Sequence, residues 1–265
     1  MSRGEGWQTV DARLATLSAD EALTIAQRPR STIVPSDVGA PSQRDLALAL
    51  LRDLGVATEQ RLRLERTLGE GGMGVVRLAT QASMGRAVAV KTLRPGAADD
   101  LAALRLLREA WVAGQLEHPN VLPVYDVTLD EHGTPQVVMK RIDGVDLATL
   151  LADPAALRER AGGDPTAFHL RVLMQVASAL HFAHDRGILH RDVKPENVML
   201  GRFDEVYVVD WGIAVSLRDD QDPRLPRVAE ATDLAGTPAY LAPEMLEGDP
   251  SRLGPWTDVY LLGAT

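Results

Sequence analysis

The segment HRDVKPEN at residues 190–197, followed by DWG at 210–212, contains the residues that decide the fold of this chain. It brings carboxylates, an ammonium group and an amide close together in the sequence. Asp192 can accept a hydroxyl proton, and Lys194 can neutralise a moving phosphoryl group. Asn197 and Asp210 supply the oxygen ligands that Mg²⁺ prefers. These residue types at this spacing indicate phosphoryl transfer.

The composition excludes several other classes of protein. The chain has 265 residues, of which 45% are apolar and 25% charged, as expected for a globular protein with a substantial core. Its net charge is −9, and it has no dense basic cluster, which argues against nucleic acid as a partner. Because there is no cysteine, disulfides, thiolate catalysis and cysteine-ligated zinc are excluded.

No apolar run approaches the roughly 20 residues that a membrane-spanning helix needs. Residues 1–10 are polar and lack the apolar core of a secretory signal. We therefore expect a cytoplasmic protein without a membrane segment.

Residues 1–60 differ from the rest and are expected to form an N-terminal extension. A helical stretch, Thr9 to Gln27, runs into a loop rich in proline and small polar residues at 28–37. The capping box at 42–45 then precedes a short apolar helix, Leu46 to Leu54, that ends at Gly55. This helix is expected to dock, either on its own lobe or on a partner protein.

Residues 61–142 predict a small β-rich lobe. Short β-prone runs are separated by glycine turns, and one stretch, 99–117, has apolar residues at helical spacing (Leu104, Leu107 and Trp111). The predicted strands cover residues 62–68, 75–80, 87–93, 121–127 and 136–142. Five strands and one helix are expected here.

Residues 143–265 predict a helical lobe, which makes the chain an α+β protein with two lobes. The stretch Thr166 to Asp185 has a helical apolar face and ends before Gly187. A short apolar strand at 206–209 leads directly into Asp210.

The N-terminal lobe contains a glycine-rich turn, GEGGMGVV at residues 69–76. Glycine lets backbone N–H groups approach phosphate oxygens closely. A Rossmann loop has similar glycines but opens a helix, whereas this turn continues into a predicted strand. An ordinary hairpin turn remains the alternative when the motif is taken alone. Downstream, VAVK at 88–91 places Lys91 on the third strand.

Together with GTPAYLAPE at 236–244, these motifs resemble the eukaryotic-like (Hanks-type) Ser/Thr protein kinases, with a bacterial character, over about residues 64–265. The resemblance implies a two-lobed kinase fold and transfer of the γ-phosphoryl group of ATP to protein Ser/Thr hydroxyls. It implies that Lys91 contacts the α- and β-phosphates and forms an ion pair with Glu109. Asp192 would be the base, assisted by Lys194.

Asn197 and Asp210 would hold Mg²⁺, or Mn²⁺ in its place. In the adenine pocket, Met139 would form the back, and backbone groups of Lys140 and Ile142 would bond the base. Many relatives have an acidic residue where Lys140 stands, a departure expected to alter ligand selectivity. The full nucleotide-binding set that the resemblance implies is Gly69, Glu70, Gly71, Gly72, Met73, Gly74, Val76, Ala89, Lys91, Met139, Lys140, Ile142 and Met199.

The resemblance also assigns supporting roles. His190 would be a packed structural link without a catalytic role, and Asp258 would bond the backbone of the turn at His190. Thr237 would lie near Asp192 and Lys194. Thr232 is the favoured site of activating phosphorylation, with Thr237 as the second candidate. Trp211 replaces the usual phenylalanine, which is expected to change how the turn flips.

The sequence ends within WTDVYLLGAT at 256–265, which resembles the start of the central helix of the helical lobe. We therefore expect an incomplete C-lobe in which Glu244 lacks its arginine partner. Autophosphorylation and self-association are further expectations. One alternative is a pseudokinase or nucleotide-binding scaffold with little transfer activity. The other is a small-molecule phosphotransferase, which the motif at 236–244 disfavours.

Overall fold

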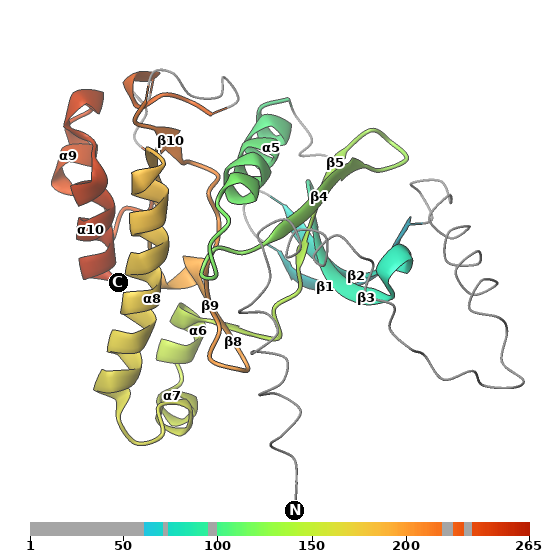
Figure 1. The fold of residues 1–265 in the computed structure, drawn as a ribbon, viewed down its shortest axis with the longest axis horizontal. Helices are drawn as coiled ribbons and strands as arrows, with labels where there is room; N and C mark the ends of the chain where they lie inside the picture. The colour runs from blue at the N-terminus through green and yellow to red at the C-terminus, as the bar shows by residue number, and fades with distance from the viewer. Residues whose placement is uncertain (1–60, 71–73, 95–99, 219–224, 231–234) are drawn as a thin grey trace, which may run out of the picture. The chain divides into compact units, whose positions relative to one another are not determined.

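The computed structural model describes residues 61–70, 74–94, 100–218, 225–230 and 235–265 (Figure 1). The predictions for the N-terminal extension at 1–60 fall outside these residues. So do Gly71, Gly72 and Met73 of the glycine-rich turn, and Thr232.

Among the described residues, the N-terminal lobe is a five-stranded antiparallel sheet with one helix against it. The strands are β1 (Leu62–Glu70), β2 (Val75–Gln81), β3 (Arg86–Thr92), β4 (Val124–Leu129) and β5 (Pro135–Lys140), in the order β1-β2-β3-β5-β4. Helix α5 (Asp100–Gln115) packs against β4 and β5, as Figure 1 shows. The predicted five strands and one helix are confirmed. Val121 lies outside β4, because it forms a bridge to Val208 in the other lobe.

The buried face of α5 differs from the one that the apolar pattern indicates. Leu106 and Ala110 are buried at 5% and 3% exposure and pack with Met139 of β5 in one apolar cluster. Leu104, Leu107 and Trp111 are only partly buried. This helix has apolar residues on more than one side. The face that packs on the sheet is the one whose side chains fit the sheet surface, and the spacing of apolar residues alone does not show which face that is.

The C-terminal lobe is mainly helical and contains short strands that carry the functional loops. Its helices are α6 (Leu147–Leu151), α7 (Pro154–Arg160), α8 (Pro165–Asp185), α9 (Pro243–Leu246) and α10 (Pro255–Ala264). Its strands are β6 (Gly144–Asp146), β7 (Ile188–Leu189), β8 (Val198–Gly201), β9 (Val206–Val208) and β10 (Val215–Ser216). Strands β6, β8 and β9 form one small sheet, and β7 pairs with β10.

Helix α8 is the longest element of this lobe, and its sequence explains both ends. The carboxylate of Asp164 caps the first turn by accepting from the N–H of Ala167, and Pro165 occupies the first helical position. Gly187 follows the helix with φ of 73°, a left-handed conformation that glycine adopts without steric cost. The inward face of α8, which includes Val176 and Leu180, is almost fully buried.

Helix α10 lies beside α8 (Figure 1) and buries Leu261 in the same core. The outer surfaces of α9 and α10 leave Leu246, Trp256 and Val259 about 60% exposed. The incomplete C-lobe stays a prediction. Within the described ranges, no helix combines the length and apolar character needed to cross a membrane.

Candidate active site

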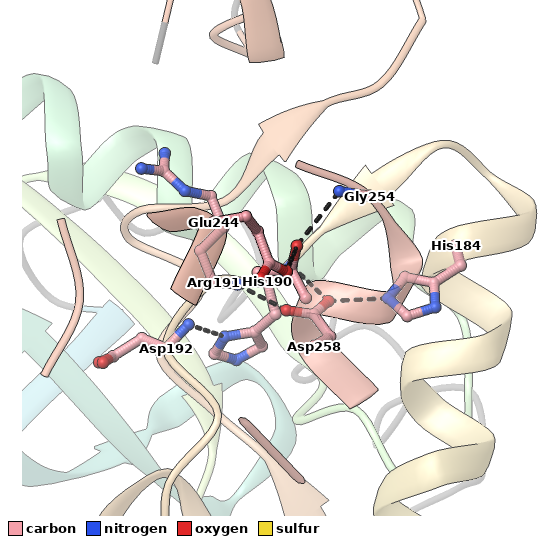
Figure 2. Close-up of polar contacts among 8 residues, drawn as sticks. His184, His190, Arg191, Asp192, Glu244, Gly254 and Asp258 are labelled. Atoms are coloured by element: carbon pink, nitrogen blue, oxygen red, sulfur yellow. Dashed lines mark hydrogen bonds and ion pairs between the residues drawn. The ribbon is translucent and has the colours of Figure 1, made fainter. Parts of the chain in front are cut away.

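A buried carboxylate on α10 binds the backbone at the start of the loop at 190–197. Asp258 is fully buried and accepts hydrogen bonds from the backbone N–H of His190 at 2.9 Å and of Arg191 at 2.8 Å. Its Oδ2 also lies 2.7 Å from Nε2 of His184 on α8. Figure 2 shows Asp258 between the loop and His184. The predicted contact of Asp258 with the turn is present, whereas His184 was not anticipated.

His190 is held by both of its ring nitrogens. Nδ1 accepts from the backbone N–H of Asp192 at 3.1 Å, so the ring proton is on Nε2, which faces the carbonyl of Val209 at 3.2 Å. The ring also packs against Trp211, with centroids 4.4 Å apart. With both nitrogens engaged and no exposed surface, His190 links the loop to the turn at 210–212, as its predicted structural role requires.

Asp192 lies at the centre of a hydrogen-bonded group. Its Oδ2 lies 2.8 Å from Nζ of Lys194 and accepts from Nδ2 of Asn197 at 3.0 Å. Its Oδ1 accepts from the hydroxyl of Thr237 at 2.8 Å, and that hydroxyl accepts from Lys194 at 2.7 Å. The loop and the segment before α9 therefore converge on one carboxylate, as expected for Thr237. Arg191, between His190 and Asp192, has a φ of 71°, and strained backbone of this kind clusters at functional sites.

Asp210 and Asn197, the predicted metal ligands, are brought together by a backbone link. The N–H of Val209 donates to the carbonyl of Asn197 at 3.0 Å, so Asp210 follows directly beside it. Asp210 also has a positive φ, 64°, and its Oδ1 is buried with no hydrogen-bond partner among the described residues. A buried acceptor left in this state is suited to a cation.

In the described part of the chain, no group of three or more His, Cys, Asp or Glu side chains could hold a metal by itself. Asn197 uses its amide nitrogen to bond Asp192, which leaves its amide oxygen as the group able to face a cation. The donor set of one carboxylate and one amide fits Mg²⁺ only when further oxygens come from a phosphate or water.

Trp211 is buried at 2% exposure beside His190. Its indole N–H has no hydrogen-bond partner among the described residues. Leaving such a donor unsatisfied costs about 1–3 kcal/mol. The substitution for phenylalanine therefore adds an unfavourable polar group to the conformation observed for this turn.

Lys91 on β3 and Glu109 on α5 form the ion pair that the sequence predicts. Nζ of Lys91 lies 2.7 Å from Oε1 and 2.6 Å from Oε2 of Glu109, with both side chains about 15% exposed. Burial of Lys91 opposes its charge, but Glu109 and Asp210 outweigh that effect, and the pKa of Lys91 is raised. The ammonium group therefore stays charged.

The ends of the glycine-rich turn pair as a β-hairpin. Gly69 pairs with Val76 and Glu70 with Val75, so this turn joins two strands and opens no helix. A Cβ on Gly74 would lie 2.3 Å from the carbonyl oxygen of Thr92, so no other residue fits at that backbone contact. The arrangement is that expected for a phosphate-covering hairpin and differs from a Rossmann loop.

The remaining predicted nucleotide residues come from both lobes. Val76 and Ala89 are on β2 and β3, and the buried Met139 pairs with Ala89 in β5. Met199 lies on β8 in the C-terminal lobe. Ile142 follows Lys140, the last residue of β5, whose backbone N–H donates to the carbonyl of Pro123 at 3.0 Å.

The side chain of Lys140 makes contacts that the sequence did not reveal. It reaches Tyr207 and Glu205 in the other lobe. Tyr207 occurs in an ordinary apolar strand pattern, and no local signal marks it or His184 as a partner of a distant charge.

Glu244 also has a partner that was not anticipated. Its Oε1 accepts from the hydroxyl of Thr257 at 2.7 Å, and that hydroxyl accepts from the N–H of Gly254 at 3.2 Å (Figure 2). In the described structure Glu244 therefore has a hydrogen-bond partner, in place of the arginine whose absence we expected. These bonds tie the end of the 236–244 segment to the first turn of α10.

Comparison with known proteins identifies similar chains. A family model described as "Protein kinase domain" matches residues 62–265. The chain is 37% identical over 223 residues to Serine/threonine-protein kinase PknD of Chlamydia caviae, covering 77% of this chain and 23% of the relative. It is 36% identical over 215 residues to Serine/threonine-protein kinase pkn3 of Myxococcus xanthus, covering 79% of this chain and 37% of the relative. The chain thus spans a quarter to a little over a third of the length of these curated relatives.

Proposed function

The chain belongs to the protein kinase family, and from that membership we propose that it transfers the γ-phosphoryl group of ATP to serine and threonine hydroxyls of proteins. Its relatives in bacteria are named serine/threonine-protein kinases. The single observation that carries the proposal is the carboxylate of Asp192. It is oriented at once by Lys194, Asn197 and Thr237, beside an unsatisfied buried oxygen of Asp210.

Binding of the nucleotide would use the hairpin turn and the segment at 138–142 that joins the two lobes, which we call the hinge. Backbone N–H groups around Gly69 to Gly74 would contact phosphate oxygens, and Lys91, held by Glu109, would contact the α- and β-phosphates. The base would lie between Ala89 and Val76 of the N-terminal lobe and Met199 of the C-terminal lobe. Because the N–H of Lys140 is already used by Pro123, the base would meet the carbonyl of Lys140 and the backbone of Ile142.

Asp210 and Asn197 would hold a Mg²⁺ ion, or Mn²⁺, together with phosphate oxygens. When bound, the metal supplies charge neutralisation on the phosphates. Asp210 would supply a carboxylate oxygen to the ion. The hydrogen bond from the N–H of Val209 to the carbonyl of Asn197 would hold the two ligand residues near each other.

Asp192 would accept the proton of the acceptor hydroxyl and align that hydroxyl for in-line attack. Lys194, 2.8 Å from Asp192, would neutralise charge that develops on the transferred group. Positioning and charge stabilisation supply most of the catalysis in this type of reaction. The Thr237 hydroxyl fixes both side chains, so in this structure it is engaged in the site, and Thr232 remains the favoured site of phosphorylation.

We further propose that its substrates are proteins, that it phosphorylates itself and that it acts in the cytoplasm. The relatives, which are serine/threonine-protein kinases by name, support the first of these proposals. The test is incubation with γ-labelled ATP and Mg²⁺, with and without Asp192→Asn. An exposed aspartate variant, Asp143→Asn, serves as the matched control. Label on the protein or on an added protein substrate, lost in Asp192→Asn and kept in Asp143→Asn, is the expected result.

Two other results would replace the proposal. ATP binding without transfer to any acceptor would indicate a nucleotide-binding scaffold. Transfer only to small hydroxyl compounds, with no label on protein, would indicate a small-molecule phosphotransferase.

A further inference from the structure

The strand that joins the lobes ends in a lysine whose side chain leaves its own lobe. Lys140, the last residue of β5, donates a hydrogen bond from Nζ to the phenol oxygen of Tyr207. The same Nζ lies 3.5 Å from Oε1 of Glu205 and 4.7 Å from the centroid of the Tyr207 ring. We call Lys140, Glu205 and Tyr207 the hinge cluster. One side chain of the N-terminal lobe is thus bound to two of the C-terminal lobe.

The partner of Lys140 in the C-terminal lobe is buried and belongs to a sheet. Tyr207 is 6% exposed and lies on β9, where it pairs with Met199 of β8. Asp210 follows it by three residues. The hinge cluster therefore joins β5 to β9, which pairs with β8 and its predicted pocket residue Met199 and which leads to the predicted metal ligand Asp210.

A second link between the lobes reaches the same strand. The N–H of Val208 donates to the carbonyl of Asn120 at 2.7 Å, and the N–H of Leu122 donates to the carbonyl of Val208 at 3.3 Å. Pro123, next in the chain, accepts from the N–H of Lys140. The backbone around 120–123 and the side chain of Lys140 therefore hold β9 at two adjacent residues, Val208 and Tyr207.

The charges of the hinge cluster are matched. The pKa of Lys140 is raised, mainly by the hydrogen bond to Tyr207. Burial lowers this pKa by a smaller amount, and the negative charge of Glu205 raises it further. The lysine therefore stays charged. An acidic side chain, the type that many related kinases have at this position, would here face Glu205 with like charge. The attraction between the lobes at this point therefore requires opposite charges at positions 140 and 205.

We propose that Lys140 is a positioning residue that, through Tyr207 and Glu205, fixes the hinge backbone at 140–142 relative to β8 and β9 and thereby sets the affinity for a purine nucleotide. This inference rests on the proposed function, because it concerns the same nucleotide site. The side chain of Lys140 acts through its C-terminal partners and does not touch the base. Its effect is therefore on nucleotide binding more than on the transfer step.

The test measures binding of a fluorescent ATP analogue with Mg²⁺ to the full chain. Lys140→Glu is expected to raise Kd about tenfold and Tyr207→Phe about threefold, in proportion to the loss of charge-assisted and hydroxyl contacts. The exchange Lys140→Glu with Glu205→Lys is expected to return Kd to within about twofold of the original, since it restores opposite charges. Glu159→Lys reverses an exposed charge on α7 and is the control, with Kd unchanged.

Steady-state kinetics distinguish positioning from a general loss of stability. The KM for ATP is expected to rise with Kd while kcat changes by less than about twofold, as when uniform binding is lost. Unchanged Kd in both Lys140→Glu and Tyr207→Phe, or a charge exchange that binds no better than Lys140→Glu alone, would overturn the inference.

If the original protein neither binds the analogue nor transfers phosphate, the proposed function itself fails. Amide hydrogen exchange of residues 140–146 then tests separately whether the hinge cluster holds the two lobes together. Faster exchange in Lys140→Glu supports the tie between the lobes, and unchanged exchange refutes it.

Discussion

His184 on α8 and Asp258 on α10 form a 2.7 Å contact between side chains 74 residues apart in the sequence. The carboxylate involved is the one that holds the backbone of the loop preceding Asp192. The packing of α8 against α10 therefore helps to position the loop that carries Asp192, the candidate catalytic base.

Replacing Asp258 with alanine is expected to destabilise the fold. Two buried backbone N–H groups, those of His190 and Arg191, would lose their acceptor, at a cost of about 3 kcal/mol in the free energy of unfolding. His184→Ala should cost only about 1 kcal/mol, because Asp258 keeps both backbone donors. Thermal unfolding of each variant beside the exposed control Asp143→Ala measures the difference. Equal losses in the two variants would contradict this ranking.

Thr237 offers a test of how Asp192 is oriented. Thr237→Val keeps the shape of the side chain but removes the hydroxyl that bridges Asp192 and Lys194. We expect kcat to fall roughly tenfold to a hundredfold, since small misplacements of reacting groups are costly. Thr237→Ser keeps the hydroxyl and should retain most of the activity. Equal rates in the valine and serine variants would show that the bridge does not matter.

Magnesium should stabilise the protein only in the presence of nucleotide. The predicted metal ligands are one carboxylate, Asp210, and one amide, Asn197, and the carboxylate of Asp192 is already bonded to Lys194, Asn197 and Thr237. Mg²⁺ alone is therefore expected to leave the unfolding temperature almost unchanged. Mg²⁺ with ATP at a hundred times Kd should add about 2.7 kcal/mol. Asp210→Asn should abolish the part of that gain that depends on metal, while ATP with EDTA gives the same shift in both proteins.

The ion pair between Lys91 and Glu109 predicts a dependence of stability on alkaline pH. Because the pKa of Lys91 is raised in the folded state, its stabilisation is complete below the unfolded value of about 10.4. It is lost as the pH rises through the folded value. The neutral double variant Lys91→Met with Glu109→Gln lacks this titration. The difference in unfolding free energy between the two proteins should therefore shrink above about pH 10.4 and stay constant between pH 7 and 9.

Much of the site could be predicted from short segments of sequence. The residues of 190–197, Asp210 and the hairpin ends around Gly69 and Gly74 are recognisable because their chemistry depends on residue type at close spacing. The pairing of Lys91 with Glu109 was predicted from the resemblance to protein kinases, and the structure contains it. The two-lobed fold followed from the change in hydrophobic period between the two halves of the chain.

Other features depended on packing that no local pattern encodes. The sequence alone predicted the strands and helix of the N-terminal lobe and the long helix α8, because helix and strand periods and turn residues are properties of neighbouring positions. It also predicted which side chains would carry the chemistry. Only the tertiary structure decided that α5 buries Leu106 and Ala110, that His184 meets Asp258, and that Lys140 crosses to Tyr207. Those contacts join residues distant in the chain, and they arise when close-packed surfaces select one face and one rotamer from several that the sequence permits.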